Sequence, residues 1–294
     1  MPSLDKAAQR ENIKLLLLGD SGSGKTGALA CLAEAGYNLR ILDFDVGAVD
    51  VLTAYVDPKY WPQIEVVTLT DKLRARGTTV IPVGQPKAFA HALGLLDNWR
   101  YWLTEDGSLS RKEIKGQAPE ADFGPLSSWT SKDILVIDSF SHMGTAAFRY
   151  VLFANNRSGQ QPFQSDWGEA QRMLEGVLQE LSDSTLKCSI IVNTHVTIVE
   201  PTTTTKDGDQ VPLAGGIIKG LPAALGKALS PRIGTYFNTT LLCKTRGVGN
   251  SAKRRIHCLP EGLVEVKLPA KEVPRDLPVS DGLKTVFDLL LPAE

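Results

Sequence analysis

Apolar positions along the chain fall into short continuous runs that are separated by longer stretches with helical spacing. The runs are residues 13–19, 39–45, 64–70, 133–140 and 188–195. Runs of this length that are mostly apolar indicate strands that are buried on both faces, as in parallel sheets. Because segments with helical periodicity lie between several of them, the pattern predicts βα units around a mostly parallel sheet with helices on both faces.

The segments between and after these runs predict the remaining elements. We expect helices at 25–35 (ended by Gly36), 86–103, 166–183 (capped by Asp166), 223–229 and 280–291, and strands at 236–246 and 254–259. The last two strands predict a C-terminal β-hairpin extension of the sheet. Residues 104–132 and 197–222 are polar and rich in turn-forming residues, so we expect mobile insertions there.

The composition of the chain is that of an ordinary globular protein. Its 294 residues are 43% hydrophobic and 22% charged, and the net charge of −1 leaves anion binding to local patches. The four cysteines form no CxxC pair, which favours free thiols in a reducing compartment. No apolar run approaches the roughly 18 residues of a membrane span, and the polar N-terminus is unlike a targeting signal. We therefore expect a cytoplasmic protein without a membrane partner.

The stretch "GDSGSGKT" (19–26) matches the phosphate-binding pattern G-x-x-x-x-G-K-[ST] and lies between a predicted strand and a predicted helix. In such a loop, glycines let backbone N–H groups point at phosphate oxygens, and the helix adds its positive end. Lys25 is expected to contact the β and γ phosphates, and the Thr26 hydroxyl to bind Mg²⁺. The predicted nucleotide contacts are Gly19, Asp20, Ser21, Gly22, Ser23, Gly24, Lys25, Thr26 and Gly27.

Acidic residues follow two of the predicted strands. Asp138 ends the run 133–140 at the carboxyl edge of the sheet, where open parallel sheets bind ligands, so we expect it to help hold Mg²⁺. Asp43 and Asp45 end the run 39–45, and their mutual repulsion is explained if a magnesium–nucleotide complex lies opposite them. Asp50, further along, is expected to be a helix cap or a solvated acid.

The order of these segments resembles that of the RecA-type ATPases. "ILDFDVG" resembles the strand that carries their catalytic carboxylate, and "ILVIDSFSHM" resembles their Walker-B strand. "IIVNTHV" resembles the next strand, whose polar end senses the γ-phosphate and leads into a mobile DNA-binding loop. The resemblance spans about residues 13–268, and only the P-loop is specific by itself. It implies a RecA-like P-loop NTPase core that uses ATP and Mg²⁺.

The resemblance also assigns roles to single residues. Asp45 matches the acid that activates the attacking water, Asp43 would be a supporting acid near Mg²⁺, and His195 occupies the sensor position. With Lys25 and Asp138 they make up the predicted catalytic and metal-binding set. The family usually has Glu as the base and Gln as the sensor, so slow or DNA-gated hydrolysis would be no surprise. The alternative for Asp45 is an acid in a loop without a catalytic role, and the alternative for His195 is an ordinary histidine at a strand end.

Two segments are candidates for contacts with single-stranded DNA. Residues 149–164 combine basic and aromatic side chains, which suit single strands because stacking tolerates any base. Residues 197–222 follow the sensor strand directly, although acidic residues oppose the basic ones there. The candidates are Arg149, Phe153, Arg157, Lys206 and Lys219. For the first segment, an ordinary connection between helices is the alternative.

The predicted C-terminal hairpin carries a cluster of basic residues: Lys244, Arg246, Arg254 and Arg255. Such a cluster is most often a solvated face. Two other interpretations are a patch for the phosphate backbone and a cationic finger that reaches the γ-phosphate of a neighbouring subunit. The finger predicts ATPase activity that depends on oligomerisation.

The resemblance therefore implies an ATP-dependent, oligomeric DNA-binding protein that promotes annealing or recombination. Its compact size is similar to that of phage-encoded RecA-like single-strand-annealing ATPases, which would place it in host cytoplasm, with a single-strand-binding protein as a further partner. We expect a ring or a filament, built from a core (13–268), an N-terminal polar tail (1–12) and a C-terminal tail with a short helix (269–294). The alternatives are a translocating motor, such as a helicase or packaging ATPase, and a nucleotide-gated scaffold with negligible hydrolysis.

Overall fold

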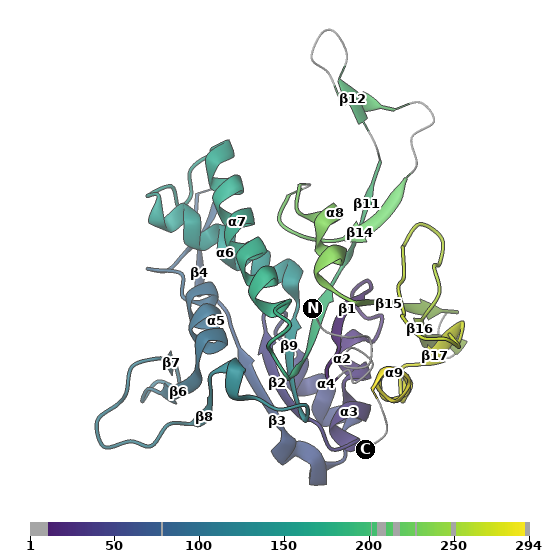
Figure 1. The fold of residues 1–294 in the computed structure, drawn as a ribbon. Coiled ribbons are helices and arrows are strands. Elements are labelled where there is room, and N and C mark those ends of the chain that lie inside the picture. Colours follow the sequence, from purple (N-terminus) through teal and green to yellow (C-terminus); the bar gives the residue numbers. More distant parts are fainter. Residues whose placement is uncertain are drawn as a thin grey trace.

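A mixed, mostly parallel β-sheet forms the centre of the molecule (Figure 1). The computed structural model describes residues 11–77, 79–200, 202–204, 210–213, 218–226, 228–247 and 251–291. Within them, the central sheet has eight strands in the order β17-β16-β15-β1-β10-β9-β2-β3. These are β1 (Lys14–Leu18), β2 (Asn38–Asp43), β3 (Ile64–Thr68), β9 (Asp133–Asp138), β10 (Ser189–Thr194), β15 (Thr239–Arg246), β16 (Lys253–His257) and β17 (Asp276–Pro278).

The order and direction of these strands confirm the predicted fold class. All neighbours from β15 to β3 pair in parallel, whereas β16 and β17 continue the sheet in antiparallel pairing as the expected C-terminal hairpin extension. β10 lies between β1, which leads into the P-loop, and β9, which ends at Asp138. This insertion of one strand between the two is the RecA-like arrangement of a P-loop NTPase.

Helices cover both faces of the sheet (Figure 1). Within the described chain they are α2 (Lys25–Ala28), α3 (Ala30–Glu34), α4 (Ala48–Tyr55), α5 (Ala88–Asp97), α6 (Phe140–Ala154), α7 (Gln164–Leu181), α8 (Ser230–Ile233) and α9 (Gly282–Leu290). Leu15 and Leu17 of β1 belong to the core on the side of α2–α4 and α9, while Leu16 and Leu18 belong to the core on the side of α5–α8. Alternate residues of a strand point to opposite faces, so an uninterrupted apolar run is buried on both.

The segment 86–103 differs from its prediction as a single helix. α5 ends at Asp97, and β6 (Trp99–Leu103) follows, paired with β7 (Leu109–Ser110) and β8 (Ala121–Gly124). The sequence of β6 is "WRYWL", and its bulky aromatic residues favour a strand. Residues 104–132 therefore contain two strands of a small sheet.

Three other boundaries also shift. α6 extends to Ala154, so part of the segment predicted as a DNA-binding loop is helical. α7 begins at Gln164, and Asp166 caps it from inside the first turn, because its carboxylate accepts the backbone N–H of Phe163 at 2.8 Å. The short helix expected at 223–229 lies at α8, Ser230–Ile233.

A β-arm made of β11 (Val196–Val199), β12 (Thr202–Thr204), β13 (Gln210–Pro212) and β14 (Lys219–Pro222) projects away from the central sheet (Figure 1). β11 pairs with β14 and β12 pairs with β13, both antiparallel. The described part of the insertion predicted at 197–222 thus consists of two successive antiparallel strand pairs. The remaining small elements are β4 (Leu73–Arg76), β5 (Thr79–Pro82), and the 3₁₀ helices Pro58–Gln63, Leu126–Ser128 and Gly234–Tyr236.

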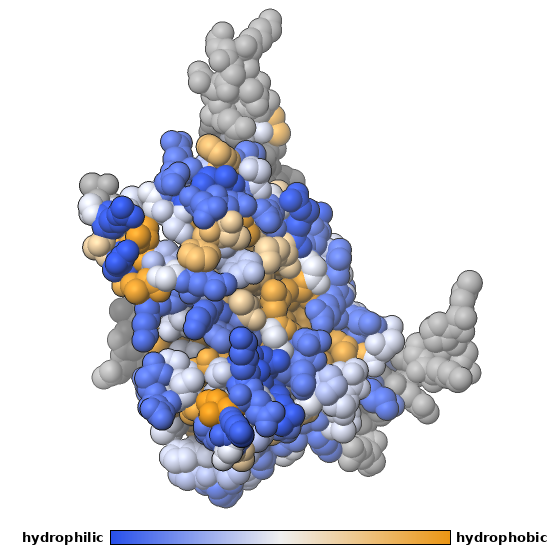
Figure 2. All heavy atoms as spheres, turned by 90° about the vertical axis from the view of Figure 1, so that its left-hand side faces the viewer, coloured by the Kyte–Doolittle hydropathy of each residue, from blue (hydrophilic) through white to orange (hydrophobic). Residues whose placement is uncertain are grey.

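The segment expected as a C-terminal tail with a short helix contains, within its described residues 269–291, β17 and α9, which pack on the rest of the chain. In α9, the Phe287 ring meets Tyr37 edge-on with the ring centroids 5.3 Å apart, and the Lys284 N–H points at the sulfur of Cys31. All four cysteines are buried free thiols, as expected. On the side that carries α5–α7, apolar side chains lie among hydrophilic ones (Figure 2). None of the helices in the described chain has the length and apolar character needed to span a bilayer.

Candidate functional site

The P-loop joins β1 to α2 at the carboxyl edge of the sheet. Gly24 has a φ of +99°, in the left-handed region that favours glycine, and a Cβ there would lie 3.0 Å from Cδ of Arg254. A Cβ on Gly19 would lie 2.5 Å from the carbonyl oxygen of Cys243 on β15. Both positions therefore require glycine, one for its backbone conformation and one for the close approach of a neighbouring strand.

Lys25 is almost fully buried inside this loop. Its ammonium group donates to the carbonyl oxygens of Gly19 at 2.7 Å and Asp20 at 3.0 Å. Burial lowers the pKa of Lys25, and the nearby carboxylate of Asp138 acts in the opposite direction. The cation is thus held at the mouth of the loop, where a phosphate oxygen can exchange for one of these carbonyls.

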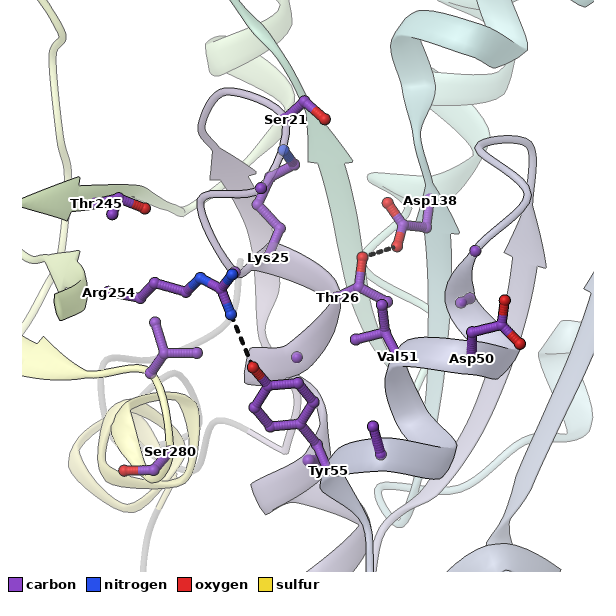
Figure 3. A pocket seen from close by; sticks show the side chains of 18 of the residues that line it. Ser21, Lys25, Thr26, Asp50, Val51, Tyr55, Asp138, Thr245, Arg254 and Ser280 are labelled. Carbon is purple, nitrogen blue, oxygen red and sulfur yellow. Dashed lines mark hydrogen bonds between the residues drawn. The ribbon is translucent and has the colours of Figure 1, made fainter. Parts of the chain in front are cut away.

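Thr26 and Asp138 lie together at the ends of the P-loop and of β9 (Figure 3). The Thr26 hydroxyl donates to the Asp138 carboxylate at 2.6 Å. Burial raises the pKa of Asp138, while this hydrogen bond lowers it. A hydroxyl and a carboxylate are the hard oxygen donors that Mg²⁺ takes beside nucleotide phosphates, so the two residues fit the predicted metal site.

Asp43, predicted as a further metal ligand, has a different role. Its carboxylate accepts four backbone N–H groups, from Asp45 and Val46 on one oxygen and from Gly47 and Ala48 on the other. The side chain is buried, and it anchors the turn that leads into α4. Because both oxygens accept backbone N–H groups, the geometry does not fit the predicted role of Asp43 as a metal ligand.

Replacing Asp43 by alanine is expected to destabilise the protein by roughly 2–3 kcal/mol, because buried N–H groups lose a charged acceptor. The measurement is urea unfolding followed by circular dichroism. Asp43→Asn, which keeps one of the two acceptor oxygens, is the matched control and should lose less stability. Equal stability of Asp43→Ala and the wild-type protein would contradict this role.

Asp45 and His195 converge with a third residue that the sequence did not single out. His142 lies in the first turn of α6, and its Nδ1 is 3.3 Å from Oδ1 of Asp45. The rings of His142 and His195 meet edge-on with centroids 5.7 Å apart. Burial lowers the pKa of His195, and the positive charge of Lys25 lowers it further. His142 stands four residues after Asp138 in "DSFSHM", and this spacing from the Walker-B acid was the only available signal.

A pocket of about 1200 Å³ opens beside the P-loop. The P-loop and α4 line one part of it, and β16 and the segment before α9 line another (Figure 3). Arg254 and Tyr55 bridge these parts, because the guanidinium of Arg254 donates to the Tyr55 hydroxyl at 2.7 Å. Asp50 lies in the first turn of α4 at the pocket, and its side chain is exposed.

The four residues predicted as fingers toward a neighbouring subunit make contacts within their own chain. Lys244 and Arg246 lie close to Glu261, and Arg255 pairs with Asp276 at 2.7 Å. Arg254 lines the pocket of its own P-loop. The arrangement therefore favours a contact of Arg254 with a nucleotide in the same subunit rather than in a neighbour.

Arg254→Ala is expected to weaken ATP binding about tenfold, or 1.4 kcal/mol, because the pocket loses one of the cations that line it beside the P-loop. Titration with a fluorescent ATP analogue at two protein concentrations measures this, and the factor should be the same at both. Arg246→Ala, which removes a basic residue of the same hairpin that does not line the pocket, is the control. Unchanged affinity combined with a concentration-dependent loss of turnover would instead indicate a finger acting on a neighbour.

The residues predicted to contact DNA have different surroundings in the structure. Arg157 donates to the buried carboxylate of Asp166 through two nitrogens. It therefore stabilises the loop before α7, and its guanidinium is already paired. Phe153 is partly exposed on α6, and Arg149 lines a small cavity on the same helix. Lys219, on the arm, pairs with Glu265 at 2.9 Å. Lys206 lies outside the described residues.

Both ends of the arm are hydrogen-bonded to Ser141, which lies in the first turn of α6, three residues after Asp138. The Ser141 hydroxyl lies 2.9 Å from that of Thr194 and donates to the carbonyl oxygen of Ala223 at 3.1 Å. It also accepts the backbone N–H of His195 at 3.2 Å, and the N–H of Ala223 donates to the His195 carbonyl at 2.7 Å. This junction could not be predicted from sequence patterns, since its members come from three separate segments.

The sheet order and the P-loop together define a P-loop NTPase fold of the RecA-like type. No protein-family model and no curated protein matches the chain. Among solved structures, it is similar to a KaiC-like protein from the hyperthermophilic archaeon Pyrococcus horikoshii, with 12% identity and a TM-score of 0.39 over 90% of this chain and 84% of that one.

Two further solved structures are similar at the same low level. The flagellar accessory protein FlaH from Methanocaldococcus jannaschii has 10% identity and a TM-score of 0.39, covering 94% of this chain and 91% of that one. The RadB recombinase has 14% identity and a TM-score of 0.36, covering 87% and 91%. The fold assignment itself follows from the strand order and the P-loop described above.

Proposed function

We propose that this protein binds and hydrolyses ATP with Mg²⁺ and uses the nucleotide to control binding of single-stranded DNA by its β-arm. The observation that carries the proposal is the Ser141 junction, which joins both ends of the arm to the edge of the nucleotide site. As an oligomer, such a protein would promote annealing or recombination of DNA strands.

The residues of the site have distinct tasks in this proposal. P-loop N–H groups and Lys25 bind the phosphates, and Thr26 and Asp138 would hold Mg²⁺, which neutralises phosphate charge when bound. Asp45 is exposed at the same edge of the sheet and accepts the proton of the water that attacks the γ-phosphorus. The bond from that phosphorus to the β–γ bridging oxygen then breaks, leaving ADP and phosphate.

The connection from hydrolysis to DNA runs through His195. A γ-phosphate that contacts the His195 side chain acts on the residue immediately before β11. The backbone of the same residue is hydrogen-bonded to Ser141 and to Ala223, which directly follows the last strand of the arm. On the arm, Ile198 is 60% exposed and Leu213 is 47% exposed, and these aliphatic side chains offer apolar surface for contacts with bases or with a neighbouring subunit.

The arm can be removed cleanly, because Val196 and Pro222 are directly paired residues of its two outer strands. We would join them by an Asn-Gly turn, which suits a two-residue hairpin. Fluorescence anisotropy of a labelled single-stranded oligonucleotide should then show binding by the wild-type protein that changes with a non-hydrolysable ATP analogue. The variant without the arm should lose this binding.

Retention of nucleotide binding by the armless variant is the control for folding. Equal DNA binding by both proteins would contradict the role of the arm. Absence of DNA binding by the wild-type protein in every nucleotide state would contradict the proposed function as a whole.

A further inference from the structure

We propose that Asp45, His142 and His195 form a second metal site, which binds a transition-metal dication such as Zn²⁺ and is distinct from the Mg²⁺ site at Thr26 and Asp138. The two histidines are half of the four in the sequence. Each of the three residues offers one ligand atom, and these atoms all lie within 4.8 Å of one another.

The sheet brings the three residues together. Asp45 follows β2 by two residues, His142 follows β9 by four, and His195 directly follows β10. These strands are adjacent and parallel in the order β10-β9-β2, so their carboxyl ends meet at one edge. The convergence is therefore fixed by the strand register and not by the position of a single loop.

The spacing of the ligand atoms fits a metal. With bonds of about 2.0–2.1 Å, two ligands of a tetrahedral Zn²⁺ ion lie roughly 3.3 Å apart. Nδ1 of His142 and Oδ1 of Asp45 are 3.3 Å apart. The ligand atom of His195 lies within 4.8 Å of the other two. It therefore has to move by no more than about 1.5 Å to reach the spacing of a tetrahedral site. The side chains of His142 and Asp45 are 47% and 41% exposed, so they are free to rotate for this.

The neighbours of His142 leave room for such a bond. The hydroxyl of Ser139 lies 2.8 Å from the same Nδ1 and would leave that atom by rotation about one single bond. By contrast, His257 is buried against Glu261, and His91 lies on α5 outside this cluster. Among the described residues, this cluster is the only group of three or more His, Cys, Asp or Glu side chains whose ligand atoms lie close enough to hold one ion.

The kind of ligand selects the kind of metal. Two imidazoles and one carboxylate suit Zn²⁺, Co²⁺ and similar ions, whereas Mg²⁺ prefers oxygen ligands throughout. Three protein ligands also leave a coordination position for water or for a phosphate oxygen. The two sites of this edge therefore differ in chemistry, with oxygen donors at Thr26–Asp138 and mixed donors at Asp45–His142–His195.

Occupation of this site has a consequence that rests on the proposed function. A dication bound by Asp45 takes up the carboxylate that would accept a proton from the attacking water. Zn²⁺ added to the Mg²⁺-supported reaction is then expected to inhibit ATP hydrolysis. In His142→Ala, the same Zn²⁺ concentration should inhibit at least about tenfold less strongly, which corresponds to 1.4 kcal/mol in metal affinity.

The site itself is tested without nucleotide, by titrating the chelator-treated full-length protein with Co²⁺ and recording visible absorption. One equivalent should bind saturably, without the intense sulfur-to-metal band that a cysteine ligand would give. His142→Ala and His195→Ala should each weaken binding at least about tenfold, and His91→Ala, the control histidine, should bind like the wild-type protein. Thermal unfolding checks that each variant is folded.

The outcomes separate the two proposals. No saturable Co²⁺ binding, equal binding by the folded His142→Ala and His195→Ala variants, or displacement of Co²⁺ by a modest excess of Mg²⁺ would overturn the metal site. Co²⁺ binding at these residues without Zn²⁺ inhibition would uphold the metal site and argue against Asp45 as the acceptor of the water proton.

Discussion

The Asp45→Asn variant is expected to bind ATP as tightly as the wild-type protein and to hydrolyse it at least about a hundredfold more slowly, since a general base contributes 10²–10⁴-fold. The amide keeps the size of the side chain but cannot accept the proton of the attacking water. The backbone N–H of Asp45 donates to the carbonyl oxygen of Asp138 at 3.2 Å, a bond that the substitution keeps. Among the hydrogen bonds of the described residues, the Asp45 carboxylate has none to Lys25, Thr26 or Asp138, so phosphate and Mg²⁺ binding are spared. Phosphate release and titration with a fluorescent ATP analogue measure the two quantities.

Asp50→Asn is the matched control for this variant. Asp50 also lines the pocket and is exposed, but it lies in the first turn of α4, away from the end of β2. It should hydrolyse ATP at the wild-type rate. Unchanged hydrolysis by Asp45→Asn would show that the attacking water is activated elsewhere.

Lys25→Ala is expected to weaken ATP binding at least about a hundredfold, which corresponds to 2.7 kcal/mol. The buried ammonium group is the cation held inside the P-loop, and alanine cannot replace its bonds to phosphate. Isothermal titration calorimetry with Mg²⁺ and ATP measures the loss. Lys59→Ala, a surface lysine paired with Asp57, is the control and should bind normally. If Lys25→Ala bound ATP with wild-type affinity, the loop would not be the nucleotide site.

The central sheet was predictable because its signal is local and repeated. Each inner strand is a short, mostly apolar run, and in β1 the successive residues Leu15 and Leu16 belong to the two different cores of the molecule. The P-loop was predictable for a similar reason, since its glycines and Lys25 stand at fixed spacing between a strand and a helix. Asp138 followed from the rule that parallel strands present ligands at their carboxyl ends.

The prediction for 86–103 failed because only Asn98 separates the two elements and no glycine or proline marks the boundary. The helical spacing of α5 continues into "WRYWL", and only the aromatic content of that stretch favours the strand β6. The burial of Trp99 and Tyr101 in the same core as α5 is a tertiary effect that periodicity cannot show.

The roles of single acids and bases in the site could not be read from the sequence, because they depend on partners far along the chain. Asp43 and Asp45 look alike in "LDFD", yet one is buried under four N–H groups and the other is exposed. Arg157 looks like a free basic residue until Asp166 is seen beside it. Arg254 meets Tyr55 across 199 positions of sequence.

The most direct test of the account is the rate of ATP hydrolysis with and without single-stranded DNA, measured for the wild-type protein and for the variant without the arm. DNA is expected to stimulate hydrolysis by the wild-type protein and to leave the armless variant at its basal rate. Hydrolysis that is identical with and without DNA in the wild-type protein would contradict the account.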